Sequence, residues 1–418
     1  MMRNGRFRVV DTLLLLVVFA WHTFPGLYAE DWSRFRGPRG NGSSSDKQVP
    51  TEWSDSKNIK WKLRLPGAGF SSPIVVGERI FVTSFSGSRN RVKRQLVCVD
   101  RQTGVAAWTK VVDGVSDGGD RGASNHGQAS HTPVSDGERV YAMFGSSGVI
   151  AFDLSGKQLW KQDLGNERAA RFGTASSPIL HRDHLIVTAG AESESIRALD
   201  KKTGKEVWKT EAGSLSGTYS TPLIVTNPKG IEELLLSVTF ELWSLNPTSG
   251  KLNWFAETRV DTAAVPSLIA HDGMAYVIGG RRGGRTAVRI DGKGDVTESG
   301  VLWSTSGGAY VPSPVLHEGR LFWVNDSGIA SCIDAKTGKQ IARKRLGGRF
   351  YASVALIDNK LYAVNRSGET HVLKATPEFE QIALNKLSDD SEFCGSPAIS
   401  NGQLFIRSDA FLYCVAAQ

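Results

Sequence analysis

A unit that recurs about eight times constrains this chain more than any other feature of its sequence. Its clearest copy, Ala198–Trp208, ends in Asp-x-x-Thr-Gly-Lys-x-x-Trp, and a second copy runs from Val99 to Trp108. Self-similarity at a period of about 40–50 residues is typical of solenoids and propellers, in which each repeat is one supersecondary unit. The repeat therefore predicts the architecture before any single residue is considered.

Each unit begins with Ser or Thr, usually before Pro, and continues as short alternating strands. Alternation of apolar and polar residues between Gly, Asp and Asn turns indicates half-buried antiparallel strands. Four such strands per unit, repeated radially, describe a β-propeller. The unit starts lie at Ser72, Thr132, Ser177, Thr221, Ser267, Ser313, Ser353 and Ser396, and the fourth strands carry Trp108, Trp160, Trp208, Trp254, Trp303, Ile341 and Ile382.

The two ends of the chain supply one unit between them. The copy that begins at Ser396 has three strands and then stops, and Ile59–Leu63 has the pattern of the missing fourth strand. An N-terminal strand that completes the last unit joins the ends and removes an open sheet edge. We therefore expect an all-β, eight-bladed β-propeller of four-stranded antiparallel blades over residues 59–418, preceded by an extended segment at 30–58.

Residues 1–29 have the composition of a secretory signal peptide. Arg3, Arg6 and Arg8 precede the apolar run Leu13–Phe19, and a cleavage point follows at Ala29. An uncleaved anchor is the alternative, but the apolar run is short for a membrane span and no second candidate follows it. The mature chain is therefore expected in the periplasm or outside the cell, with no transmembrane domain beyond the signal.

The charge of the chain argues against nucleic-acid binding. The formal net charge is +8, and loss of the three Arg and one Asp of the signal leaves +6, spread along the mature chain. Nucleic-acid binding requires a concentrated basic patch. Three basic clusters, at Arg89–Arg94, Arg281–Arg285 and Arg343–Arg349, are expected on solvated loops, with an acidic partner or ligand as the alternative.

The four cysteines are not adjacent to one another. Three of Cys98, Cys332, Cys394 and Cys414 occupy the same small apolar position in a third strand, which favours buried packing thiols. Cys98 and Cys414 lie in units that ring closure makes neighbours. A disulfide between them is therefore the alternative in an oxidising compartment.

Aromatic residues recur just before the unit starts, where the innermost strands of a propeller open onto its central funnel. Together with two arginines, they would form a rim able to stack on a flat, anionic ring. The alternative is that these side chains only pack adjacent blades. The candidate ligand-binding residues are Phe70, Arg171, Tyr219, Tyr310, Arg349, Tyr351 and Phe393.

Two segments contain residue types that bind metals. The insert Asp113–Ser130 holds three Asp and His126 and is followed by His131, and Asp291–Glu298 mixes acidic residues with Gly. Oxygen ligands on Gly-rich loops suit Ca²⁺, and His suits a metal or a general base. Neither spacing matches a ligand signature, so we expect a solvated loop and a turn. No nucleophile elbow, phosphate loop or His-Glu-x-x-His occurs, and the sequence nominates no catalytic residue or metal ligand.

The repeat resembles that of the pyrroloquinoline quinone (PQQ)-type, or quinoprotein-like, β-propeller family. The likeness extends from about Asp31 to Gln418, and the opening Asp31–Pro38 resembles that of secreted PQQ-binding-like repeat proteins. The resemblance implies a tryptophan-docking role, in which each Trp packs between blades and caps the turn of a neighbour. The residues that match this role are Trp61, Asp100, Gly104, Trp108, Trp160, Asp200, Gly204, Trp208, Trp254 and Trp303.

Two branches of that family imply different functions. Quinoprotein alcohol dehydrogenases use PQQ, Ca²⁺ and a catalytic Asp, and they carry an adjacent Cys-Cys pair that this chain lacks. The outer membrane protein assembly factor BamB is a non-enzymatic periplasmic scaffold of similar length, anchored to lipid through a cysteine that has no match here before Cys98. We interpret the chain as an exported binding or scaffold module of the cell envelope, with an envelope or secreted protein partner. A small-molecule ligand and a PQQ- and Ca²⁺-dependent dehydrogenase are the alternatives.

Overall fold

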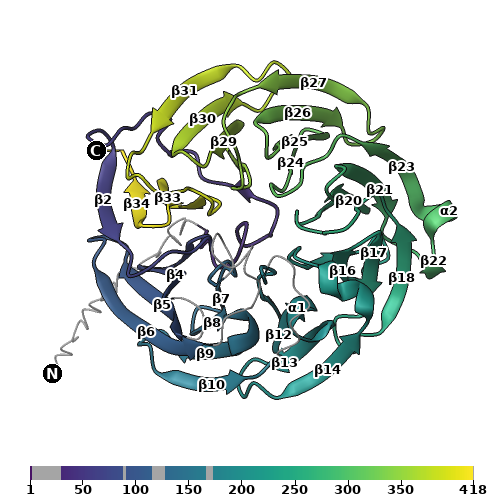
Figure 1. Ribbon diagram of the computed structural model, residues 1–418, viewed down its shortest axis with the longest axis horizontal. Coiled ribbons are helices and arrows are strands. Elements are labelled where there is room, and N and C mark those ends of the chain that lie inside the picture. Colours follow the sequence, from purple (N-terminus) through teal and green to yellow (C-terminus); the bar gives the residue numbers. More distant parts are fainter. Residues whose placement is uncertain (2–29, 88–90, 115–127, 166–172, 418) are drawn as a thin grey trace.

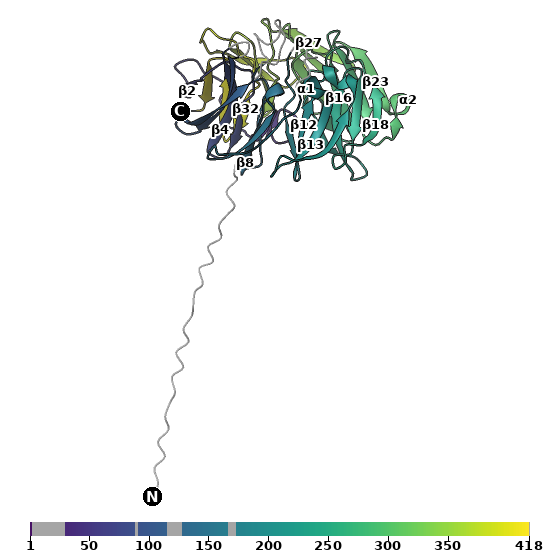
Figure 2. The same ribbon diagram turned by 60° about the horizontal axis from the view of Figure 1, so that its bottom comes forward.

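The computed structural model describes Met1 and residues 30–87, 91–114, 128–165 and 173–417. Within these ranges, eight sheets stand around a central axis and form a disc, as Figures 1 and 2 show. The predicted eight-bladed β-propeller is confirmed. The segment interpreted as a signal lies outside the described residues, apart from Met1.

The strands of each blade follow one another outward from the axis, and neighbours within a blade are antiparallel. Blade 1 consists of β3 (Ile74–Val76), β4 (Arg79–Ser86), β5 (Val92–Asp100) and β6 (Ala106–Gly114). Blade 2 consists of β7 (Val134–Ser135), β8 (Arg139–Met143), β9 (Val149–Asp153) and β10 (Gln158–Gln162). Blade 3 consists of β11 (Ile179–His181), β12 (His184–Ala189), β13 (Ser195–Asp200) and β14 (Glu206–Glu211). Blade 4 consists of β15 (Leu223–Thr226), β16 (Glu232–Val238), β17 (Glu241–Leu245) and β18 (Leu252–Glu257).

The second half of the ring repeats this order. Blade 5 consists of β19 (Ile269–His271), β20 (Met274–Gly279), β21 (Gly284–Arg289) and β23 (Val301–Ser306). Blade 6 consists of β24 (Val315–His317), β25 (Arg320–Val324), β26 (Ile329–Asp334) and β27 (Gln340–Arg345). Blade 7 consists of β28 (Ala355–Ile357), β29 (Lys360–Val364), β30 (Glu369–Lys374) and β31 (Gln381–Lys386). Blade 8 consists of β32 (Ala398–Ser400), β33 (Gln403–Arg407), β34 (Phe411–Val415) and the N-terminal strand β2 (Ile59–Arg64).

Helices in the described residues are confined to short turns. They are η2 (Gly145–Ser147), α1 (Gly190–Ser193), η3 (Gly213–Gly217) and α2 (Thr297–Gly300). Within the described ranges, no helix has both the length and the apolar composition that a membrane crossing requires.

The last blade joins the two ends of the chain, as predicted. Strand β2 pairs antiparallel with β34, so that Trp61 lies opposite Cys414. Figure 1 shows the purple β2 beside the yellow β34. The final sheet is thus completed by the strand that enters the propeller first, and its outer edge is formed by residues from the opposite end of the sequence.

Hydrogen bonds near the axis connect every blade to the next. In each blade, the backbone N–H of the Ser or Thr that opens the repeat donates to the side-chain hydroxyl of the equivalent residue in the following blade. The eight residues, in order, are Ser72, Thr132, Ser177, Thr221, Ser267, Ser313, Ser353 and Ser396, and Ser396 donates back to Ser72, with all eight distances between 2.9 and 3.1 Å. These contacts form a closed circle, which we call the hydroxyl ring. The residues that mark the repeat in the sequence are therefore the ones that join the blades.

Tryptophans make a second set of contacts between blades, farther from the axis. The indole Nε1–H of each donates to a backbone carbonyl in the following blade, from Trp61 to Arg101, Trp108 to Leu154, Trp160 to Lys201, Trp208 to Pro247 and Trp303 to Ala335, at 2.9–3.1 Å. Each indole also covers the turn glycine of that blade, namely Gly104, Gly156, Gly204, Gly250 and Gly338, all with positive φ. Asp100 and Asp200 fix two of these turns, since each accepts hydrogen bonds from the N–H and hydroxyl of a Thr three residues later.

Trp254 is the exception. Its indole N–H donates to the carboxylate of Glu233, which lies in its own blade and is 4% exposed. The following blade has no Thr-Gly turn at this level, because Asp291–Gly300 replaces it. This segment forms β22 (Gly294–Asp295), which adds parallel to β18 on the outer edge of blade 4, and then α2. The turn expected at Asp291–Glu298 is thus an additional edge strand followed by one helical turn.

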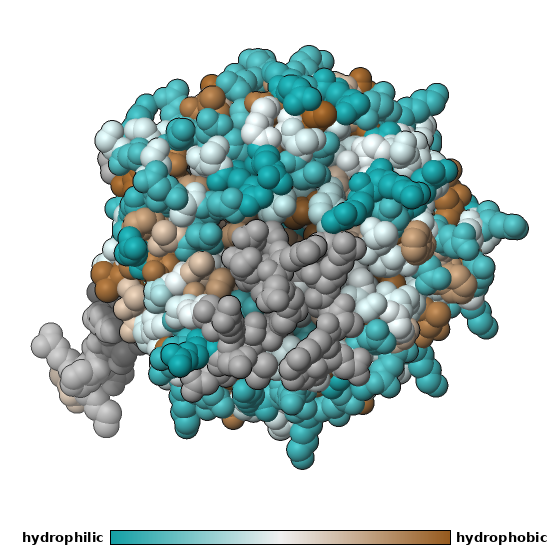
Figure 3. Space-filling model, in the orientation of Figure 1, coloured by the Kyte–Doolittle hydropathy of each residue, from teal (hydrophilic) through white to brown (hydrophobic). Residues whose placement is uncertain are grey.

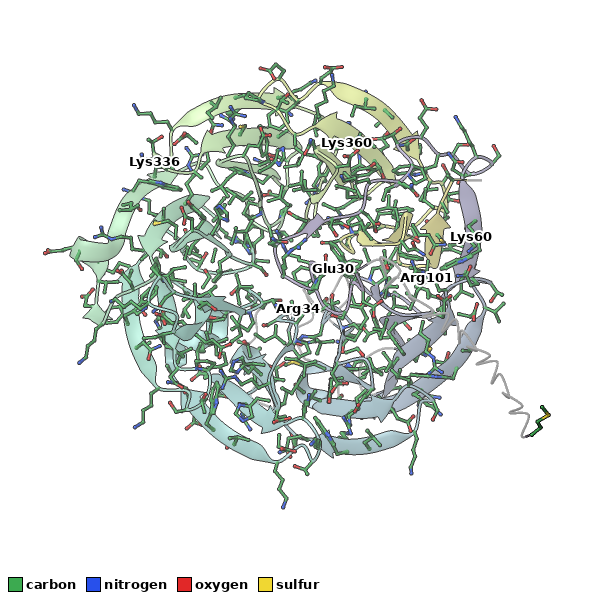
Figure 4. All side chains as sticks on the ribbon, turned by 180° about the vertical axis from the view of Figure 1, so that it is seen from behind. Glu30, Arg34, Lys60, Arg101, Lys336 and Lys360 are labelled. Atoms are coloured by element: carbon green, nitrogen blue, oxygen red, sulfur yellow. The ribbon has the colours of Figure 1, made fainter. Side chains whose placement is uncertain are left out.

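The extended segment at 30–58 crosses one face of the disc. Trp32 accepts a hydrogen bond from Val75 of blade 1, and the Arg34 guanidinium donates to Pro222 of blade 4. Strand β1 (Ser43–Ser44) adds parallel to β28 of blade 7, and Trp53 stacks on Tyr362 of the same blade at 6.3 Å between ring centroids. Figure 4, which views this face, shows Arg34 near the middle of the ring. The segment therefore connects distant blades and covers one end of the central channel.

Substitution of a docking glycine should destabilise the fold more than the same substitution at a free turn. A Cβ at Gly204 would lie 2.6 Å from the Trp160 ring, whereas a Cβ at Gly137 would meet nothing within 4 Å, and both residues have positive φ. We expect Gly204→Ala to lower the free energy of unfolding by about 2–4 kcal/mol, and the matched control Gly137→Ala by about 1 kcal/mol. Urea denaturation of the two variants measures the difference, and equal losses would show that Trp160 does not constrain the turn.

Removal of one hydroxyl from the ring should leave a buried backbone donor without its acceptor. Ser313→Ala deprives the N–H of Ser267 of its partner, and both residues are buried. We expect a loss of about 1–3 kcal/mol in the free energy of unfolding. Ser313→Thr keeps the acceptor and should lose much less, because Thr already occupies this position in blades 2 and 4. Similar losses for both variants in urea denaturation would contradict the role of the hydroxyl.

Candidate functional site

A cavity of about 190 Å³ lies at the centre of the propeller. All eight residues of the hydroxyl ring line it, so it lies on the axis. The other lining residues are Phe35, Phe70, Ser130, Thr174, Ala175, Tyr219, Val265, Tyr310, Val311, Tyr351 and Cys394. Aromatic and small apolar side chains alternate here with hydroxyls, a composition typical of pockets for small, flat ligands.

Four of the seven candidate ligand-binding residues lie together in this cavity. Phe70, Tyr219, Tyr310 and Tyr351 come from blades 1, 4, 6 and 7 and converge there because each immediately precedes an innermost strand. The Arg366 guanidinium lies 4.4 Å from the centroid of the Tyr351 ring. The convergence of the four side chains is what a ligand-binding rim requires, although ligand binding itself remains a prediction.

The other three candidates do not line this cavity in the described residues. Phe393 is 1% exposed and stacks on Tyr413 at 6.0 Å between centroids, inside blade 8. Arg349 is exposed at the surface. Arg171 lies outside the described residues. Phe393 and Arg349 precede their ring residues by three and four positions, so neither occupies the position, two residues before the ring residue, that lines the cavity in every blade.

A simple register rule identifies the lining residues that the sequence analysis missed. The residue two positions before each member of the hydroxyl ring lines the cavity in all eight blades, and these residues include Ser130, Ala175, Val265, Val311 and Cys394. Of these eight residues, the sequence predicts only the aromatic ones as lining residues. Alignment of the eight repeat starts would have identified the others.

The extended N-terminal segment supplies the floor of the cavity. Phe35 lines it, and next to Phe35 the guanidinium of Arg36 is 2% exposed and donates to the carbonyls of Asn41 and Pro314. Burial lowers the pKa of Arg36 to about 9. Because Phe35 belongs to no repeat, no periodic pattern in the sequence placed it on the axis.

Three residues expected on solvated loops are buried instead, namely His131, Arg94 in β5 and Arg285 in β21. Arg343 and Arg345 are exposed but lie in strand β27 rather than on a loop. His131 bridges Ser176 and Thr174, with its Nδ1 2.6 Å from a backbone oxygen and its Nε2 2.7 Å from a hydroxyl, so the neutral imidazole donates at Nδ1 and accepts at Nε2. Arg94 is fully buried and donates to Gln128. Burial is the main cause that lowers the pKa of His131 to about 4, which makes this residue a neutral packing group rather than a base. Asp117, Asp120 and His126 of the insert lie outside the described residues.

The described lining offers little for catalysis or for a hard cation. Among the described residues that line the cavity there is no carboxylate, imidazole, lysine or arginine. Nor do the described residues contain a cluster of three or more His, Cys, Asp or Glu side chains able to hold a metal. Calcium takes six to eight oxygen ligands, mainly from carboxylates and carbonyls. The described lining therefore does not fit the calcium ion that PQQ catalysis would require, although its aromatic rings suit a flat organic ligand.

The cysteines are buried free thiols in the described structure. Burial raises the pKa of Cys98 and Cys414 to about 12 and that of Cys332 to about 11, and it also raises the pKa of Cys394 in the cavity. Thiols with raised pKa are poor nucleophiles. The packing interpretation of these residues is therefore favoured over the disulfide.

Comparison with known proteins places this geometry among PQQ-type propellers. A family model described as outer membrane protein assembly factor BamB matches residues 43–189, 91–227 and 295–378, together more than half of the chain. BamB from Moraxella catarrhalis superposes with a TM-score of 0.62 at 14% identity, over 86% of this chain and 97% of that one. The quinohemoprotein alcohol dehydrogenase from Comamonas testosteroni superposes with a TM-score of 0.71 at 12% identity, over 93% of this chain and 81% of that one. At such identities the two structures share the fold alone.

A curated relative adds a match in sequence. The polyvinylalcohol dehydrogenase of a Pseudomonas species is 27% identical over 172 residues, which cover 36% of this chain and 24% of the relative. The chain thus spans about a quarter of the length of this relative.

The buried imidazole should make stability depend on pH. The pKa of His131 is about 4 in the folded chain and about 6.5 when unfolded, so between about pH 6.5 and pH 4 mainly the unfolded state takes up a proton, and stability falls as the pH falls through this interval. Between pH 7 and pH 5 we expect a loss of about 2 kcal/mol from this residue. Denaturation at both pH values should show a smaller loss for His131→Gln than for the native chain. A control, His271→Gln, replaces an exposed histidine; an unchanged pH dependence in His131→Gln would contradict the assignment.

Proposed function

This chain belongs to the PQQ-type β-propeller family whose model is described as outer membrane protein assembly factor BamB, and from that premise we propose that it is a non-catalytic binding and scaffold module of the cell envelope. Its place of action would be the periplasm or the cell exterior, in keeping with the signal-like residues 1–29. Its partners would be envelope or secreted proteins, and a small flat molecule could occupy the central cavity.

The chemistry of the cavity carries this proposal. General acid–base catalysis needs a side chain whose pKa lies near the working pH and that reaches the substrate. In the described lining, the residues that face the cavity are hydroxyls, aromatic rings, small apolar groups and one thiol with a raised pKa. Such a set can enclose and orient a ligand, but it provides no evident proton acceptor or electrophile.

The construction of the disc supports a scaffold role. The hydroxyl ring and the tryptophan contacts connect consecutive blades at two radii, and the N-terminal segment ties blades 1, 4 and 7 across one face. A rigid disc presents its loops and edges in fixed positions. This arrangement suits recognition of a protein partner. Binding is weaker when either surface must first be ordered, and a rigid surface avoids that cost.

A PQQ-dependent dehydrogenase is the second candidate. It draws support from the superposition on the Comamonas alcohol dehydrogenase and from the partial match to polyvinylalcohol dehydrogenase. The low identity of the first and the short coverage of the second make this support weaker than the family match. The calcium ligands that such an enzyme needs are also missing from the described lining.

Titration of the purified chain with PQQ and Ca²⁺ separates the two candidates. For a binding module, we expect no alcohol-dependent reduction of an electron-accepting dye, with or without both additives. A melting-temperature shift with PQQ that is independent of Ca²⁺ would fit ligand binding in the aromatic cavity, and Tyr351→Ala should reduce it. Dye reduction that requires both PQQ and Ca²⁺ would overturn the proposal.

A further inference from the structure

The outer edge of blade 6 combines an open strand with an excess of positive charge. Strand β27 is the last strand of its sheet, and Figure 1 shows it on the outside of the ring. Its sequence contains Arg343, Lys344 and Arg345, and the turn before it contains Lys336 and Lys339. We propose that this edge docks an extended, acidic segment of a partner protein, which adds to β27 as a further strand. This inference rests on the proposed scaffold function and names the class of partner.

The cations of this edge are not neutralised within the described chain. Neither Arg343, Arg345, Lys336 nor Lys339 forms an ion pair among the described residues. Asp334 accepts hydrogen bonds from the N–H and hydroxyl of Thr337 in the turn, and the charge of Lys336 is a weaker cause that lowers its pKa. Figure 4 shows Lys336 projecting at the rim. The carboxylates of a partner would therefore pair with Arg343 and Arg345, which form no ion pair within the described residues.

A buried arginine beside this strand strengthens the case for an anionic partner. Arg285 of blade 5 is 5% exposed, donates to Gln340 and Gly338 of blade 6, and has no partner for its Nε–H within the described structure. Burial, with a smaller effect of the charge of Arg343, lowers its pKa. The positive charge of Arg343 therefore acts on the buried guanidinium of Arg285. A carboxylate that reaches Arg343 from outside would relieve the repulsion at the same time.

The register of β27 places its side chains on two different sides. Ala342 and Lys344 face blade 7, since Ala342 packs in the core shared with that blade and the Lys344 ammonium donates to Phe379. Arg343 and Arg345 lie opposite Ser331 and Ile329 and belong to the other side of the strand, toward Arg285. Both arginines are exposed, as is Ile341 at 45%. An added strand that alternates acidic and apolar residues matches this pattern.

Blade 4 already contains an example of a further strand added to the outer edge of a blade. Strand β22 adds parallel to β18 and covers the outer edge of blade 4. The outer edge of a blade can therefore accept a further strand without distortion of the ring. In blade 6 no described segment covers β27, so its outward backbone groups are left for a partner or for water.

The other strongly basic edge differs in this respect. Strand β2 carries Lys60, Lys62 and Arg64, but the Lys62 ammonium lies 4.2 Å from the centroid of the Phe411 ring and Lys60 donates to Gln102. Its cations therefore have partners within the chain. Hydrophilic residues dominate the described periphery of the face in Figure 3, which favours a contact directed by charge rather than by apolar area.

The test uses the full chain and a seven-residue peptide that alternates glutamate with valine, labelled for fluorescence anisotropy. A matched peptide with glutamine in place of glutamate is the control. We expect the acidic peptide to bind at least tenfold more tightly than the control, and hydrogen exchange to show new protection of β27 amides. Equal binding of both peptides, or no protection in β27, would overturn the inference.

Variants locate the contact. Arg343→Gln/Arg345→Gln should weaken binding about tenfold, because two exposed charge pairs are lost. The control Lys157→Glu/Lys161→Glu changes exposed lysines at the outer strand of blade 2 and should leave peptide binding unchanged. An equal loss of peptide binding in this control would indicate non-specific attraction and overturn the inference.

Vesicles with phosphatidylglycerol that bind through Arg343 and Arg345, while the peptide does not, would assign the edge to a membrane surface instead. These measurements test binding at the outer edge of blade 6, whereas the PQQ titration tests the central cavity. The docking inference and the proposed scaffold function can therefore fail independently.

Discussion

The structure depends on one repeated hydrogen bond, from the backbone N–H of a Ser or Thr in one blade to the hydroxyl of its counterpart in the next. Eight such bonds make a closed circle at 2.9–3.1 Å, and a closed circle has no terminal donor or acceptor to leave unpaired. Each bond contributes only about 1 kcal/mol, but an unpaired N–H buried at the axis would cost about 1–3 kcal/mol. Loss of one hydroxyl would therefore leave one buried N–H without its acceptor and interrupt the circle.

Two kinds of contact hold neighbouring blades together, one near the axis and one in the outer layer. Close to the axis, small side chains with hydroxyls allow the strands to converge, and they line the cavity at the same time. Farther out, where the blades diverge, indoles such as Trp160 fill the wider gap and rest on glycines of the next blade. The side chains between the blades thus pack the fold, and the cavity and the outer edges of the blades are left to bind a ligand or a partner. The proposed functions occupy these two regions.

The repeat predicted the fold well because each copy encodes the same local structure. It also brought Phe70, Tyr219 and Tyr351 to one place, since equal positions in the blades meet at the axis, and Tyr310 joins them from one position earlier in its repeat. Non-repeating features were harder to predict. Phe35 reaches the cavity through contacts with distant blades, and His131 and Arg94 look solvated by residue type yet are buried by neighbours far away in the sequence. Trp254 donates within its own blade because the adjacent turn is replaced, which a single copy of the motif does not reveal.

The pairing of β2 with β34 has a consequence for the order in which the molecule can assemble. Trp61 emerges from the ribosome or a translocation channel long before its partner Cys414, which lies in the last strand of the propeller. Until then the first strand has no sheet to join, and the circle stays open however many blades have formed. Closure of so long a loop is slow compared with the formation of a single blade. The incomplete chain therefore exposes strand edges while it waits, and protection by a chaperone would matter most during this interval.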